Sequence, residues 1–155
     1  MNKNLGPTFI GAIIFLFCLS VTAVCFAGPK APEGYRNVKL GMTKPQIIDI
    51  LKKEPGNDSF EEMGDEIGEI IRNDNLFRFA IYKFDSQGEL IEIDLQMREI
   101  LGRDKVLELF NAQHGLNIEP SKKFVESNRA IEVQDNKIII KFASNNRSRS
   151  AKSNQ

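Results

Sequence analysis

Cysteine is nearly missing from this chain of 155 residues. Its two cysteines, Cys18 and Cys25, both lie in the first 27 residues, so the rest of the chain can form neither a disulfide nor a thiolate metal site. A cysteine nucleophile is excluded for the same reason. A domain built from the remaining residues must be held together by its hydrophobic core, and residues 28–155 are enough for one ordinary domain.

Histidine is almost as scarce, since His114 is the single one in the chain. A zinc site around it would need carboxylates for every other ligand, which is unusual. A Ser-His-Asp triad would have to be built on His114, yet no G-x-S-x-G motif accompanies it. We interpret His114 as a surface residue near a helix C-terminus, where it suits the helix dipole. Catalysis by His114 with the acids around Glu62 is the alternative.

An excess of either charge is also lacking, because 21 Lys and Arg face 21 Asp and Glu. A dedicated nucleic-acid binder would carry a strong basic excess, so nucleic acid is not an expected partner. The sequence has no P-loop and no G-x-G-x-x-G after a strand. We therefore predict no catalytic residues, no cofactor-binding residues and no metal ligands.

Acidic residues are concentrated in one stretch. They could form a calcium site or a glycosidase-like carboxylate pair, but the calcium-loop pattern D-x-D-x-D-G is absent. We interpret the stretch as a solvated acidic loop, since most charge runs are solvated. Its members are Glu61, Glu62, Asp65, Glu66 and Glu69.

The first 27 residues have the pattern of a signal peptide. Lys3 precedes an apolar run, and small residues at Cys25 and Ala27 fit cleavage after Ala27. The sequence thus predicts an exported, periplasmic protein. Two alternatives remain open: an uncleaved inner-membrane anchor, because the apolar run is nearly long enough to span a bilayer, and a lipoprotein acylated at Cys25.

The last residues, 143–155, are polar and basic and predict a disordered tail. Arg147, Arg149 and Lys152 could contact an anionic surface such as lipid headgroups, at about 1 kcal/mol per charge. Any membrane contact by the mature protein is therefore expected to be at most peripheral.

The stretch between these ends, residues 28–142, predicts a single α+β domain. Alternation predicts a hairpin of strands over 76–84 and 89–97 and another over 129–134 and 137–142, with a short strand near Phe124. A second helix is expected after Asp104, which can cap it, and Gly115 is expected to end it after His114. Residues 57–75 are interpreted as a loop followed by a strand over 66–72.

The helix expected after residue 43 has a complete start motif in the stretch LGMTKPQIIDIL. Thr43 and Gln46 form the S/T-x-x-E/Q capping box, and Pro45 falls in the first turn, where its missing N–H costs nothing. Gly41 allows a tight turn before the cap, and Met42 can pack against the helix.

Residues 40–44 are echoed by 101–105, and each stretch leads into a helix. The pattern suggests tandem α-β units. The expected fold is a two-layer sandwich in which two main helices pack on one face of an antiparallel sheet of about five strands.

The motif Gly41-Met42-Thr43, with Gln46 three residues after Thr43, resembles the helix start of the SmpA/OmlA (BamE-like) family of small envelope proteins. Tandem α/β units of this sort also look like the fold of β-lactamase-inhibitor-like proteins, which bind other proteins through the sheet. The resemblance implies a non-catalytic subunit with a role in outer-membrane protein assembly. In this interpretation Gly41, Met42, Thr43 and Gln46 specify the fold and touch no substrate.

The sequence therefore predicts a non-catalytic periplasmic interaction module whose partners are proteins of the cell envelope. Two alternatives remain open. One is an inhibitor of an envelope or secreted hydrolase, which the same fold group suggests. The other is a carrier of a small apolar ligand, with a pocket between the sheet and the helices.

Overall fold

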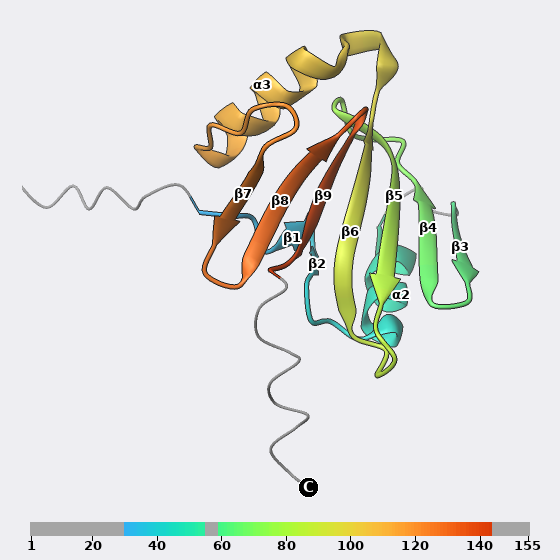
Figure 1. Cartoon of the computed structure of the whole chain (residues 1–155). Coiled ribbons are helices and arrows are strands. Elements are labelled where there is room, and N and C mark those ends of the chain that lie inside the picture. Colours follow the sequence, from blue (N-terminus) through green and yellow to red (C-terminus); the bar gives the residue numbers. More distant parts are fainter. Residues whose placement is uncertain (1–29, 55–58, 144–155) are drawn as a thin grey trace, which may run out of the picture.

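The computed structural model describes residues 30–54 and 59–143, and those residues form a large antiparallel sheet with helices behind it and at one end (Figure 1). The helical elements are α2 (Lys44–Lys53), the short 3₁₀ helix η1 (Glu99–Leu101) and α3 (Arg103–His114). The strands are β1 (Gly34–Tyr35), β2 (Val38–Lys39), β3 (Phe60–Met63), β4 (Glu66–Ile70), β5 (Phe77–Phe84), β6 (Leu90–Met97), β7 (Lys123–Glu126), β8 (Arg129–Gln134) and β9 (Lys137–Phe142).

The expected sandwich of two helices on about five strands is wrong. The described part of the chain has nine strands in two sheets: β1 and β2 form a small hairpin, and the other seven form one sheet in the order β3-β4-β5-β6-β9-β8-β7. Every pairing in the large sheet is antiparallel. It consists of two meanders, β3 to β6 and β7 to β9, joined where β6 pairs with β9.

The additional strand arises in residues 57–75, where a loop was expected before the strand. Residues 60–63 instead form β3, which pairs with β4 through a two-residue turn. Gly64 has a φ of 61°, a conformation that the first residue of such a turn requires and that glycine adopts freely. The helical spacing of the apolar residues in this stretch obscured the hairpin pattern.

One face of the sheet is buried and is called here the covered face. The helices and the β1–β2 hairpin join it in a single apolar cluster, to which α2 contributes Ile47 and Leu51 and α3 contributes Phe110. In Figure 1, α2 and the β1–β2 hairpin lie behind the sheet. Central positions of β6 such as Ile93 are fully buried, so burial of this face supplies most of the driving force for folding.

The helix start predicted from LGMTKPQIIDIL is confirmed. Thr43 is the N-cap of α2, Pro45 lies in its first turn, and Gly41 has a φ of 85°. Oε1 of Gln46 accepts hydrogen bonds from the backbone N–H of Thr43 at 2.9 Å and from its hydroxyl at 3.1 Å. The start of α2 is therefore fixed by contacts between residues three positions apart.

The second helix begins two residues earlier than expected. Gly102, with a φ of 72°, is the N-cap of α3, and Asp104 lies in the first turn instead of capping it. The predicted end is confirmed, because Gly115 is in the left-handed conformation directly after His114.

Two predictions fall outside the described residues: the signal peptide of residues 1–27 with its two alternatives, and the basic residues of the polar tail, Arg147, Arg149 and Lys152. Within residues 30–54 and 59–143, no helix is long and apolar enough to cross a bilayer.

Candidate functional site

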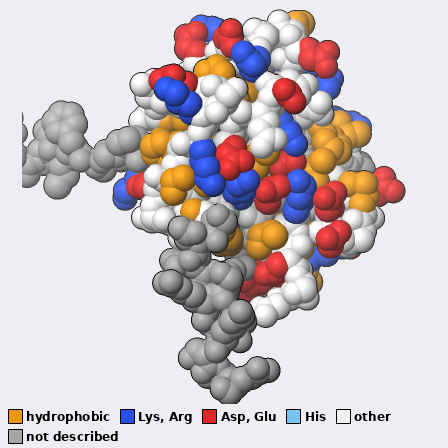
Figure 2. Space-filling view, in the orientation of Figure 1, with side chains coloured by type: hydrophobic (Ala, Val, Ile, Leu, Met, Phe, Trp, Pro, Cys, Tyr) orange, Lys and Arg blue, Asp and Glu red, His pale blue; other side chains and the backbone are white. Residues whose placement is uncertain are grey.

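The second face of the sheet is covered by none of the described elements and is called here the open face. It is the face turned toward the viewer in Figures 1 and 2. Cross-strand register places side chains from all seven strands on it in three rows. Charged residues gather over its centre, and hydrophobic residues gather on the side of β3 to β5 (Figure 2).

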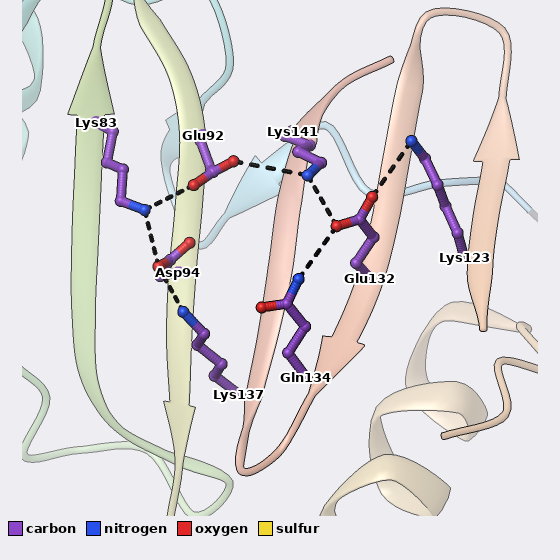
Figure 3. Close-up of polar contacts among 8 residues, drawn as sticks. All are labelled: Lys83, Glu92, Asp94, Lys123, Glu132, Gln134, Lys137 and Lys141. Carbon is purple, nitrogen blue, oxygen red and sulfur yellow. Dashed lines mark hydrogen bonds and ion pairs between the residues drawn. The ribbon is translucent and has the colours of Figure 1, made fainter. Parts of the chain in front are cut away.

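The charges at the centre form a connected network, which we call the charge ladder (Figure 3). Bases and acids alternate strand by strand, from β5 through β6, β9 and β8 to β7. Neighbouring strands are about 4.8 Å apart, so each charge reaches partners of opposite sign on both sides. The ladder consists of Lys83, Glu92, Asp94, Lys141, Lys137, Glu132 and Lys123.

The contacts within the ladder are short. Lys83 Nζ lies 2.7 Å from Glu92 and 3.0 Å from Asp94. Lys141 Nζ lies 2.8 Å from Glu132, and Lys137 Nζ lies 3.3 Å from Asp94. Each charge in the ladder thus has an internal partner, so a binding protein would have to compete with these pairs to use them.

The carboxyl group of Glu132 provides a test of the ladder in solution. The hydrogen bond from Lys141, helped by one from Lys123, outweighs the partial burial of Glu132 and holds its pKa below the usual value of 4.5. The folded state therefore gains stability from this group above about pH 4.5 and loses it as the pH falls through the lowered pKa.

We expect acidification from about pH 7 to about pH 3 to destabilise the wild type more than the Glu132→Gln variant. Thermal unfolding followed by circular dichroism at both pH values measures the difference. Glu61→Gln, which removes a carboxyl outside the ladder, is the matched control. Equal acid sensitivity of the wild type and Glu132→Gln would show that the ladder contacts are not made in solution.

Beside the ladder lies an exposed apolar cluster on β3, β4 and β5, which we call the corner patch. Met63 and Ile70 are 42% and 53% exposed, and Phe79 and Ile81 are half-buried next to them. Register pairs Phe79 with Ile70 and Ile81 with Gly68, so the residues are contiguous. Large exposed apolar side chains that adjoin one another are typical of interaction sites.

Gly68 holds the corner patch together. A Cβ atom at this position would lie 2.9 Å from the end of the Met63 side chain and 3.1 Å from the ring of Phe79. The two side chains therefore close over the bare backbone of β4 and form a continuous apolar surface. A larger residue at position 68 would push them apart.

Acidic residues next to the corner patch differ from those of the ladder. Among the described residues, Glu61, Asp65 and Glu66 make no ion pair, whereas Glu62, on the covered side, lies 3.1 Å from Lys44. These three carboxylates stay available to a partner and give the corner patch a negative rim. At the centre of the open face the charges pair with one another. At its corner an apolar patch adjoins three carboxylates that make no ion pair with the described residues.

The five acids expected to form one solvated loop lie instead on the β3–β4 hairpin, and their side chains do not share one face of the sheet. Glu69 is buried on the covered face, where it is 1% exposed. Its Oε2 accepts a hydrogen bond from the Tyr82 hydroxyl at 2.5 Å, and Arg36 Nη1 lies 3.4 Å from Oε1. Burial of Glu69 is possible because Tyr82 and Arg36 reach it from distant parts of the chain.

His114 is at the predicted helix end but is partly buried, with its ring 4.6 Å from that of Phe110. Burial lowers the pKa of His114, which favours the neutral imidazole. Within the described residues, no group of three or more His, Cys, Asp or Glu is arranged to hold a metal ion.

The residues of the helix-start motif lie away from the open face, at the start of α2. Met42 is partly buried against the core, and its sulfur lies 3.4 Å from the backbone nitrogen of Lys39. The corner patch was not identified from the sequence. Its signal was present in LFRFAIYKF, where apolar residues occupy both faces of a strand, although an antiparallel strand with a single buried face needs only one.

The chain matches no family model, no curated protein and no solved structure.

Proposed function

We propose that the protein is a non-catalytic, periplasmic interaction module of the cell envelope that binds an envelope protein through the corner patch. The observation that carries this proposal is the contrast on the open face. The ladder charges are paired with one another, whereas the corner has exposed Met63 and Ile70 beside three carboxylates without described ion partners.

The chemistry of the corner patch defines the partner. An apolar surface favours apolar side chains, and a rim of carboxylates favours Lys or Arg at the edge of the same contact. We therefore infer a partner segment that presents apolar residues flanked by basic ones. The apolar contact would supply most of the affinity, and the rim charges would raise the association rate and fix the orientation.

The charge ladder has a different part in this proposal. Because its pairs would have to be desolvated, a partner gains little by covering the centre of the sheet. The ladder keeps this part of the open face polar and confines docking to the corner.

The periplasmic location rests on the predicted signal peptide, and the link to the envelope rests on the resemblance of the Gly41 to Gln46 motif to SmpA/OmlA (BamE-like) proteins. Participation in outer-membrane assembly or maintenance follows from that resemblance, as does the alternative of inhibiting a hydrolase. The carrier alternative is the least supported, because the cavity that described residues form between the β1–β2 hairpin and α3 has about 130 Å³, below the roughly 300–1,000 Å³ of pockets that enclose drug-sized ligands.

Affinity capture from envelope extracts tests the proposal, with the full chain and two matched variants. Ile70→Lys places a charge in the corner patch, and Val125→Lys makes the same change on β7, at a residue of the same 53% exposure. We expect Ile70→Lys to weaken capture of the specific partner by about 30-fold or more, as expected for an interface hot spot, and Val125→Lys to leave capture unchanged.

Charge reversal at Glu66 tests the rim separately. Glu66→Lys should slow association and reduce its dependence on salt. Equal capture by the wild type and Ile70→Lys would refute docking at the corner. Loss of a hydrolase activity on capture would support the inhibitor alternative instead.

A further inference from the structure

An internal cavity of about 130 Å³ lies at the covered face, where the β1–β2 hairpin, the start of β5 and the C-terminal end of α3 meet. Its apolar walls include the rings of Phe77 and Phe110, which pack edge to face with centroids 6.1 Å apart. Gln113, an exposed residue of α3, also lines it, so the cavity reaches the surface there. The open face and its corner patch lie on the opposite side of the sheet.

A fixed carboxylate lines this cavity. Oδ1 of Asp74 accepts the backbone N–H groups of Leu76 and Phe77 at 2.6 and 3.0 Å, and Oδ2 accepts the Tyr35 hydroxyl at 2.8 Å. These three donors hold the carboxylate in one orientation at the cavity wall. Oδ2, which accepts a single hydrogen bond, retains lone-pair capacity for a further donor.

The charge around the cavity is negative overall. Arg36 lines it, but Nη1 of Arg36 lies 2.9 Å from Glu54 and 3.4 Å from buried Glu69, so its positive charge is already balanced. Asp74 adds a third carboxylate. Arg98, whose Nε lies 2.7 Å from the backbone carbonyl oxygen of Asp74, adds a second guanidinium, so the carboxylates still outnumber the guanidiniums by one. An anionic ligand would therefore meet net repulsion, whereas a cation would be attracted.

Arg36 is the first residue of the two-residue turn between β1 and β2. Its φ is 51°, a left-handed conformation that costs a non-glycine residue roughly 1–2 kcal/mol. The guanidinium carbon lies 5.0 Å from the centroid of the Tyr35 ring. The turn places the Arg36 side chain against the hydroxyl-bearing ring that orients Asp74.

We propose that this cavity binds a small organic cation, a primary alkylammonium group. The ammonium donates hydrogen bonds to Asp74 and to the unprotonated nitrogen of the His114 ring. The alkyl chain packs against Phe77 and Phe110, whose ring faces also attract a cation. The volume of about 130 Å³ corresponds to about four water molecules at roughly 30 Å³ each, which suits a short alkylammonium.

The test uses n-butylammonium as the probe and the imidazole proton signals of His114 as the readout. Because the chain has a single histidine, these signals can be assigned without ambiguity. We expect n-butylammonium to shift them saturably, and n-butyrate and 1-butanol, which are similar in size, to bind at least about tenfold more weakly. Stronger binding of butyrate, or equal binding of all three, would overturn the proposal.

Variants then locate the site by isothermal titration calorimetry. Asp74→Asn keeps the shape of the side chain and should weaken n-butylammonium binding by about tenfold or more, because it removes the charged acceptor. If Asp74→Asn fails to fold, the affinity of His114→Gln for n-butylammonium is measured instead, and it should also be weaker than that of the wild type. Ile70→Lys, in the corner patch, should bind the probe like the wild type, which separates this proposal from the proposed function. Unchanged affinity in a folded Asp74→Asn or His114→Gln variant would contradict the assignment.

Discussion

Replacing Ile93 with alanine should lower the free energy of unfolding by about 3–4 kcal/mol, within the usual 2–5 kcal/mol for such truncations in a core. Ile93 is fully buried in β6 and lies opposite Tyr82 on β5 and Ile140 on β9. The seam between the two meanders passes beside it, so the surrounding strands cannot easily collapse into the space left by the lost methyl groups. Urea unfolding followed by circular dichroism gives the value directly.

The control is the same substitution at Ile100, which is 90% exposed on η1. Ile100→Ala should change stability by no more than about 0.5 kcal/mol, as surface substitutions usually do. If the two variants lost similar amounts of stability, β6 would not be the centre of the core.

Replacing Tyr82 with phenylalanine should cost about 2–3 kcal/mol. The substitution keeps the ring and removes only the hydroxyl that donates to Glu69 at 2.5 Å. A carboxylate at 1% exposure cannot recover that hydrogen bond from water, and losing a donor to a buried charged group is costly. Arg36 still contacts Glu69 in the variant, which limits the loss.

Tyr35→Phe is the matched control, because its hydroxyl also donates to a carboxylate but at a part-buried site where Asp74 keeps two backbone donors. We expect a loss of about 1 kcal/mol there. If Tyr82→Phe were no more destabilising than Tyr35→Phe, the buried Glu69 would not depend on the Tyr82 hydroxyl.

Alkaline pH gives a second measurement on the same group. Burial, and then the charge of Glu69, raise the pKa of Tyr82 well above the usual 10. An unfolded tyrosine ionises near pH 10 while the folded one does not, so stability falls as the pH rises above about 10. The Tyr82→Phe variant should show a smaller fall than the wild type over the same range.

Local patterns explain which elements could be predicted from the sequence. The start of α2 depends on Thr43 and Gln46, which are three positions apart, and the hairpin of β8 and β9 depends on strict alternation across a short turn. Both signals are contained in a few neighbouring residues. The folded structure keeps both elements because its tertiary contacts favour the same local conformations.

Features that depend on distant residues could not be predicted in this way. In the sequence, Glu69 is part of an acidic run, but its burial depends on Tyr82 and Arg36, which are 13 and 33 positions away. The cavity likewise joins residues of the β1–β2 hairpin with α3. The expected number of strands was wrong because β3 is short, has two glutamates between its apolar ends, and pairs with β4 through a turn at Gly64.

The seam between β6 and β9 has a consequence for how the chain folds. Each meander can form from contacts between neighbours in sequence, on the microsecond scale of hairpins. The seam instead joins positions about forty residues apart, such as Gln96 and Lys137, and its loop-closure entropy must be overcome before its contacts contribute. Docking of the two preformed halves is therefore the expected rate-limiting step, and the pairs of Asp94 with Lys137 and Glu92 with Lys141 favour the correct register when the halves meet.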